Sequence, residues 1–357
     1  SLLWSLADLS GSLEFSVLSA MQSRFADHSI QLALEIVWRS PKISRLFANP
    51  EAKPASHSGL FILAAGKLGG RDLNFSSDVD LIAFYDKIEL KAAPMYGVSH
   101  AVTECLKSLS TLLSKETADG FVWRVDWRLR PYASLRKLSM VSDKALDFYH
   151  YSARPWHRLA MIKARPVAGN LELGHAFMSD LGSFLWRHNL DYRAIDDVAA
   201  LKDKINLEHP ALAQQREEEE IRLEQGRGMN LKLGHGGIRE IEFVVNAQQL
   251  LWGGRKPALR NSNTLQALKV LENEALLSSE DARDLERAYI FLRQAENRLQ
   301  MQENAQVYHL PEEGQELERY LALHGVGDWD EFNRVLSDHR CQVYRVFSGL
   351  FSEEEAE

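Results

Sequence analysis

The stretch GKLGGRDLNFSSDVDLI, residues 66–82, decides how this chain is expected to fold. It follows a short apolar run, Leu60 to Ala65, and it ends inside a second apolar run, Val79 to Tyr85. Both runs have the length of a strand and are bounded by residues that favour turns. The stretch therefore predicts a strand, a glycine-rich turn and a second strand of the same sheet.

Two carboxylates, Asp78 and Asp80, stand at the start of the second strand. Residues i and i+2 of a strand point to the same face, so these side chains are expected to lie together. Like charges held side by side repel each other, and a bound cation removes that cost. An all-oxygen site selects Mg²⁺ or Mn²⁺ rather than zinc. The alternative is that both aspartates are turn or helix-cap residues, and the glycine-rich turn upstream makes that reading less consistent with the sequence.

A third run, FVWRVDWRL at residues 121–129, is also predicted to be a strand. Its charged residues Arg124, Asp126, Arg128 and Arg130 alternate with apolar ones, so one face is charged and the other is apolar. An aspartate among arginines is usually paired with them. Because Asp78 and Asp80 already suggest a metal site, Asp126 is instead expected to be a third metal ligand. The guanidinium groups that flank it could bind phosphate.

The rest of the chain has helical periodicity. A helix is expected over residues 96–114, and others fill nearly everything after Asp143. Near the N-terminus, five apolar residues are spaced for a buried helical stripe: Leu13, Phe15, Val17, Leu18 and Met21. The fold class is therefore α+β. Three segments are predicted: a helical segment at 1–50, a catalytic domain at 51–170 and a helical bundle at 171–357.

The composition of the chain argues against several classes of protein. The chain has 357 residues, 45% of them hydrophobic, and a formal net charge of -8, which argues against a nucleic-acid partner. Its two cysteines, Cys105 and Cys341, form no metal motif and suit a reducing, cytoplasmic location. No apolar run is long enough for a membrane span, and the opening residues do not form a signal peptide. Because no Met begins the chain, we expect it to be a fragment of a longer protein.

Four motifs together resemble one known family. GKLGGRDLNFSSDVDLI, VDWRLRP, AMIKARPVAG and KLGHGGIREIEF occur in the order found in glutamine synthetase adenylyltransferase/adenylyl-removase. That family belongs to the DNA polymerase β-type nucleotidyltransferase superfamily and carries two related halves. The wording NLKLGHGGIREIEF is similar to the N-terminal half, which removes AMP from a glutamine synthetase tyrosine by phosphorolysis.

The resemblance implies a polymerase β-like mixed sheet and a set of site residues. Asp78, Asp80 and Asp126 would hold Mg²⁺ or Mn²⁺ and carry catalysis. Phosphate or nucleotide would be bound by a further set: Gly69, Gly70, Ser77, Arg128, Arg130, Lys163 and Arg165. Arg239 and Glu242 could close the catalytic cleft, although their i,i+3 spacing is also that of an ordinary ion pair.

The implied partners are glutamine synthetase as substrate, PII signal protein as regulator, and ADP, ATP and inorganic phosphate. Two alternatives stay open: adenylylation of glutamine synthetase from ATP, and a PII-sensing module with little activity of its own. The sequence departs from the family in the loop after Pro131, at His157 and at His235. These departures bear on loop geometry and substrate fit and leave the three aspartates intact.

Overall fold

The computed structural model describes residues 2–48, 55–131, 137–187, 226–303 and 305–350. The chain forms two compact units. We call them the sheet unit, Ser19–Leu73 with Ser77–Trp186, and the helical unit, Ser1–Leu18 with Asn74–Ser76 and Arg187–Glu357. The three predicted segments divide the chain at other points and stay a prediction.

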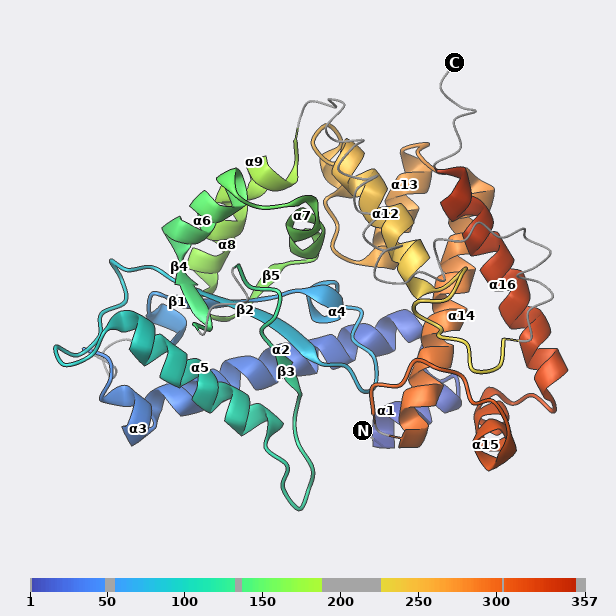
Figure 1. The fold of residues 1–357 in the computed structure, drawn as a ribbon, viewed down its shortest axis with the longest axis horizontal. Coiled ribbons are helices and arrows are strands. Elements are labelled where there is room, and N and C mark those ends of the chain that lie inside the picture. Colours follow the sequence, from blue (N-terminus) through green and yellow to red (C-terminus); the bar gives the residue numbers. More distant parts are fainter. Residues whose placement is uncertain (1, 49–54, 132–136, 188–225, 304, 351–357) are drawn as a thin grey trace. The chain divides into compact units, whose positions relative to one another are not determined.

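A mixed sheet lies at the centre of the sheet unit (Figure 1). Within the described residues it has five strands: β1 Leu60–Ala64, β2 Val79–Tyr85, β3 Val125–Asp126, β4 Ser139–Val141 and β5 Arg165–Gly169. β1 pairs antiparallel with β2 on one side and with β5 on the other. β2 has two parallel neighbours, with β3 beside its first residues and β4 beside its last. The sheet and its helices confirm the predicted mixed fold class.

Helices cover both faces of this sheet. They are α2 Phe15–Arg39, α3 Pro41–Ser44, α4 Gly66–Gly69, α5 Val98–Ser114, α6 Ser142–Tyr151, α7 Pro155–Ile162, α8 Leu171–Asp180 and α9 Gly182–Leu185. One apolar core joins α2 and α5 to alternate residues of β1 and β2. A second apolar core packs the helices α6, α7, α8 and α9 against the other face of the sheet. Both predicted strands are therefore buried on two sides, which explains their continuous apolar runs.

The prediction of a third strand over residues 121–129 is wrong in extent, because β3 has only two residues. The backbone N–H groups of Val122 and Trp123 both donate to the carbonyl of Leu113 at the end of α5. Those amides are therefore committed to the helix and not to a strand ladder. Trp127 ends the strand by turning into the core, where its indole N–H donates to Ser110.

The expectation of helix almost throughout after Asp143 missed β5, and β4 was not anticipated either. β5 contains Pro166, which lacks an N–H and so reads poorly as a strand. It is tolerated here because β5 is at the edge of the sheet, where one row of backbone groups needs no partner. Three residues, as in β4, are too few to show a strand period.

The predicted stripe on the first long helix is partly wrong. Phe15 and Leu18 are buried, but Val17 and Met21 are 43% and 40% exposed. On a helix, positions 15 and 18 share one face, while positions 17 and 21 share another. Only the first pair therefore faces the core.

The helical unit has longer helices and, in the described residues, contains no strand of the sheet. They are α1 Leu2–Leu9, α12 Ile238–Trp252, α13 Thr264–Asn273, α14 Ser279–Glu303, α15 Gly314–His324 and α16 Trp329–Gly349. One face of α14 is apolar and buried, and it carries Leu285, Tyr289, Leu292 and Leu299. Among the described residues, no helix combines the length and the apolar character that a bilayer crossing requires.

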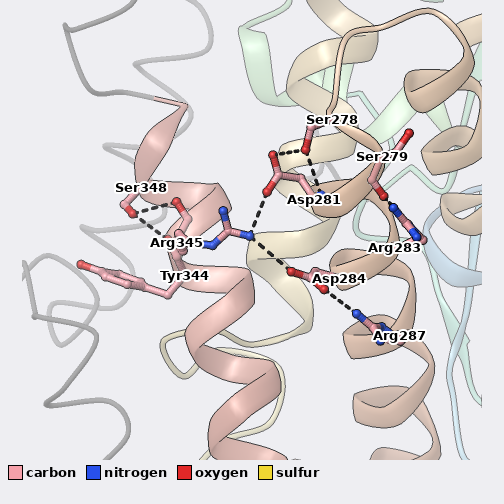
Figure 2. A network of polar contacts seen from close by, with 9 residues as sticks. All are labelled: Ser278, Ser279, Asp281, Arg283, Asp284, Arg287, Tyr344, Arg345 and Ser348. Atoms are coloured by element: carbon pink, nitrogen blue, oxygen red, sulfur yellow. Dashed lines mark hydrogen bonds and ion pairs between the residues drawn. The ribbon is translucent and has the colours of Figure 1, made fainter.

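Polar contacts tie α16 to α14 within the helical unit. Figure 2 shows the Arg345 guanidinium reaching two carboxylates of α14, Asp281 at 2.9 Å and Asp284 at 3.3 Å. Asp284 also accepts a hydrogen bond from Arg287 one turn further along α14. Because Asp284 is buried, pairing with two cations compensates for the water that its carboxylate has lost.

Three residues between the glycine-rich turn and Asp78 also belong to the helical unit. The Asn74 side chain and the Ser76 amide both donate to Oε1 of Gln300, each at 2.9 Å. The Phe75 amide donates to Oδ1 of Asn297. Side chains of α14 therefore hold this backbone by accepting hydrogen bonds from the amides of Phe75 and Ser76.

Replacing Phe177 with alanine should destabilise the sheet unit strongly. Its ring lies 5.5 Å from that of Phe61 and 4.7 Å from that of Phe84, and it is only 3% exposed. Loss of a buried phenyl ring costs about 3–5 kcal/mol in the free energy of unfolding. Denaturant titration should show this loss, whereas Leu171→Ala, an exposed site on the same helix, should change it by less than about 0.5 kcal/mol. Equal effects of the two variants would contradict the packing described.

Candidate active site

The pairing of β2 with β3 brings the three predicted aspartates to one face of the sheet. In this parallel pair Asp80 lies directly beside Asp126, and Val79 lies beside Val125. Neighbours in register project to the same face. Asp78 stands two residues before Asp80, so its side chain is expected on the same face of the sheet. The register thus places the three residues on one face of the sheet, and their role as metal ligands and in catalysis stays a prediction.

Two arginines neutralise these carboxylates. Nε of Arg124 lies 2.8 Å from Oδ1 of Asp78, and the Arg128 guanidinium lies 2.6 Å from Oδ2 of Asp126. The other oxygen of Asp126 accepts from the Arg128 backbone amide at 2.7 Å. Asp126 raises the pKa of Arg128 through the side-chain hydrogen bond from the guanidinium and through its charge, and the charges of Asp80 and Asp78 raise it further. One guanidinium therefore experiences the field of all three aspartates.

Asp78, Asp80 and Asp126 suit a divalent cation, because all three are carboxylates and they share one face of the sheet. Within the described part of the chain, no three carboxylate, imidazole or thiol groups stand close enough to hold an ion as they are placed. Arg124 and Arg128 contact carboxylate oxygens that a metal would need. The Arg128 side chain is 84% exposed, so its ion pair is weak and can open readily. An oxygen-only set of three aspartates suits a hard cation once the arginines turn away.

Gly66, which the sequence analysis did not single out, is the glycine that touches the aspartates. A Cβ atom there would lie 2.3 Å from Oδ2 of Asp80, and its φ of +54° is in the left-handed region. Next to it, the Ala65 amide donates to the Asp80 carbonyl at 2.9 Å. The position of Gly66 directly after the apolar run Leu60 to Ala65 was the available signal, because the chain must turn there.

The predicted phosphate-binding glycines are engaged within the turn. The amides of Gly69 and Gly70 donate to the carbonyls of Ala65 and Gly66. A Cβ atom on Gly69 would lie 2.1 Å from the Lys163 carbonyl, so glycine is needed there for close backbone packing. Ser77 is buried beside the aspartates in sequence. Phosphate binding by these three residues stays a prediction.

Lys163 and Arg165 stand behind the glycine-rich turn. The Lys163 ammonium lies 3.9 Å from the buried Asp72 carboxylate. The Arg165 guanidinium makes two 2.9 Å hydrogen bonds to Asp27 on α2 and donates to the carbonyls of Leu68 and Gly69. Arg165 therefore clamps the turn to α2 through four of its five donors. The predicted phosphate contacts of both residues remain untested.

Arg130 holds the backbone after β3. It donates to the carbonyls of Trp127 and Lys137, which spans both ends of the loop at 131–137. The altered family motif, residues 132–136, lies outside the described residues. Arg239 and Glu242 are on α12 in the helical unit, both half-buried. Their proposed role at a cleft stays a prediction.

Comparison with known proteins identifies the family. Residues 1–180 match the model of the glutamate-ammonia ligase adenylyltransferase family. The chain belongs to this family. Residues 207–351 also match the family described as GlnD PII-uridylyltransferase. Both matches are to nucleotidyltransferases, which agrees with three aspartates on one sheet face.

Curated members of the adenylyltransferase family resemble the chain over nearly its whole length. Three are bifunctional glutamine synthetase adenylyltransferase/adenylyl-removing enzymes. The one from Xanthobacter autotrophicus is 38% identical over 99% of the chain. Those from Bradyrhizobium sp. BTAi1 and Rhodopseudomonas palustris TIE-1 are each 37% identical over 98% of it. The chain spans only 35%, 35% and 34% of these relatives' own lengths, so it corresponds to a piece of such an enzyme.

In this family member, Arg128→Ala should strengthen the binding of divalent cations. The exposed guanidinium competes with metal for Asp126, and an exposed ion pair of this kind is worth about 0.2–1 kcal/mol. Calorimetric titration with Mn²⁺ should therefore give a dissociation constant lower by roughly 1.4- to 5-fold. Arg39→Ala, at the exposed end of α2, serves as the control for a lost positive charge. Weaker binding by the Arg128 variant would show that the guanidinium supports the site instead of competing for it.

Arg165→Lys should loosen the glycine-rich turn locally. Lysine keeps the charge but cannot make the two-pronged contact with Asp27 while also donating to two carbonyls. The amides of Gly69 and Gly70 should exchange hydrogen with solvent faster, by about tenfold for each 1.4 kcal/mol lost. Exchange in α5 should not change. Uniform acceleration across the sheet unit, or none in the turn, would contradict the clamp; Arg39→Lys is the matched substitution.

Proposed function

We propose that this chain removes AMP from an adenylylated tyrosine of glutamine synthetase by metal-dependent phosphorolysis, yielding ADP and the unmodified enzyme. The observation that carries the proposal is the register of Asp80 beside Asp126, with Asp78 on the same face. Three clustered carboxylates are what two-metal phosphoryl transfer requires of a protein. The names of the relatives, which combine adenylylation and adenylyl removal, supply the substrate.

The direction of the reaction rests on the sequence motifs. The segment NLKLGHGGIREIEF, residues 230–243, is similar to the half of the family that removes AMP. Its glycines are structurally required: a Cβ atom on Gly236 would lie 2.2 Å from the Arg340 carbonyl of α16. The same segment begins α12, so the motif fixes the start of a core helix of the helical unit.

The reaction places specific demands on the protein. Inorganic phosphate attacks the α-phosphorus of the AMP–tyrosine ester, a P–O bond to phosphate forms, and the bond to the tyrosine oxygen breaks. The leaving phenol has a pKa of about 10, so its developing charge needs stabilisation. Divalent cations, when bound, would supply that stabilisation and neutralise the phosphates.

The chain's own residues would then divide the work. Asp78, Asp80 and Asp126 would hold the divalent cations. Arg124 and Arg128, released from the aspartates, would be available to pair with phosphate oxygens. Gly66 leaves the space beside Asp80 that any side chain would fill. Arg165 would keep the turn in place from behind.

Incubation with adenylylated glutamine synthetase, Mg²⁺ and phosphate should release ADP. Asp80→Asn, which is nearly isosteric, should lower the rate by on the order of a hundredfold or more because transition-state charge is left unneutralised. Asp119→Asn, an exposed aspartate in the turn after α5, should leave the rate unchanged. No ADP from the wild-type chain, or equal rates for the wild type and Asp80→Asn, would refute the proposal.

Two other functions are tested by the same preparation. The aspartates serve transfer in either direction, so labelled ATP with unmodified glutamine synthetase tests for adenylylation. The match of residues 207–351 to a family named for PII favours an interaction with that signal protein. Tight PII binding together with no Mg²⁺ binding would indicate a regulatory module in place of an enzyme.

A further inference from the structure

A pocket of about 200 Å³ lies in the sheet unit where β2 ends. Ala83 and Tyr85 of β2 line it together with Ser139 of β4. In the parallel pairing of these strands Ala83 is the partner of Ser139, and Tyr85 is the partner of Val141. The pocket is therefore built on a pair of strands in register.

This pocket is separate from the three aspartates. Ala83 and Tyr85 alternate with Asp80 along β2, so they face the opposite side of the sheet. Their side belongs to the core that contains α2 and α5, whereas Ile82 and Phe84 face the core that contains α6 and α8. A molecule bound here would not occupy the space in front of Asp80.

The residues around the pocket carry positive charge. Arg130, Lys137 and Lys144 line it, and among its described lining residues there is no carboxylate. Lys144 pairs with Asp147 at 3.0 Å, and Arg130 donates to the carbonyls of Trp127 and Lys137. Burial raises the pKa of Tyr85, so its phenol stays protonated and adds no negative charge. The local field favours an anion.

Ser139 supplies an independent sign of a ligand. It is only 8% exposed, and its hydroxyl has no hydrogen-bond partner among the described residues. A buried hydroxyl without a partner is costly, and such groups in native proteins usually serve a ligand or a bound water. Because Ser139 lies opposite Ala83, its side chain is on the side of the sheet that forms the pocket.

The first turn of α5 completes the wall. Ser99 lines the pocket and is the second residue of this 17-residue helix. Backbone N–H groups at a helix start carry partial positive charge and favour an anion nearby. A volume of about 200 Å³ is below the range of about 300–1,000 Å³ typical of drug-sized ligands, so the ligand must be small.

We propose that this pocket is a binding site for a small organic anion, a carboxylate or a phosphate ester, separate from the proposed catalytic site. The Ser139 hydroxyl donates to an oxygen of the anion, and Arg130 and Lys137 balance its charge. The inference rests on the pocket and holds whichever reaction the aspartates catalyse.

Calorimetric titration of the full chain in Mg²⁺-free buffer tests this site. The probes are succinate and glycerol 3-phosphate, with the neutral compounds succinamide and glycerol as matched controls. At least one anion should bind with a stoichiometry of one, and its neutral counterpart should not bind. Binding of only one of the two anions tells whether the site takes carboxylates or phosphate esters.

Three variants locate the binding. Lys137→Gln changes an exposed residue and should weaken anion binding by roughly tenfold, because a charged hydrogen-bond donor is lost. Ser139→Ala should weaken binding too, yet raise the melting temperature of the ligand-free chain by removing an unpaired buried hydroxyl. Asp80→Asn should leave binding unchanged.

Several results would overturn the proposal. They are the absence of binding by both anions at tens of millimolar, equal binding by the neutral compounds, and unchanged binding in both Lys137→Gln and Ser139→Ala. Loss of binding in Asp80→Asn would assign the anion to the aspartate face. A lower melting temperature for ligand-free Ser139→Ala would show that the hydroxyl already has a partner.

Discussion

Repulsion among three carboxylates on one sheet face is the constraint around which this structure is arranged. The parallel register of β2 and β3 forces Asp80 and Asp126 together, and Asp78 adds a third charge two residues away. Such a cluster persists in a folded chain only if positive charge compensates it. Arg124 and Arg128 provide that charge here, and family membership suggests that metal ions take over the role during catalysis.

Strand pairing thus determines which residues come together at the site, and no single motif does so alone. The i, i+2 spacing of Asp78 and Asp80 fixes their common face from sequence, since a strand alternates. Nothing in the sequence fixes the strand beside which Asp126 lies, because pairing is a long-range property. The charged face of the run around Asp126, taken together with Asp78 and Asp80, supplied that expectation, and the register between Asp80 and Asp126 agrees with it.

The failures of sequence reasoning have identifiable physical causes. β5 contains a proline, which a strand tolerates only at the edge of a sheet. The hydrophobic periodicity of a sequence does not show which strand is at the edge. β3 is short because the amides of Val122 and Trp123, just before it, donate to the carbonyl of Leu113 in α5. The pairing of Arg165 with Asp27, a residue 138 positions earlier in the chain, is a long-range contact that residue spacing does not show. Gly66 was overlooked because a glycine's necessity depends on its neighbours, here Asp80.

The hydrogen bonds that residues 74–76 donate to Gln300 and Asn297 have a consequence for dissecting the protein. The peptide that leads into Asp78 is covalently part of the catalytic segment, yet its amides depend on acceptors more than two hundred residues later. A shortened protein that stops at Trp186 would keep Asp78, Asp80 and Asp126 and lose those acceptors. An inactive fragment of that kind would thus report a disordered approach to the aspartates, and would say nothing against their chemistry.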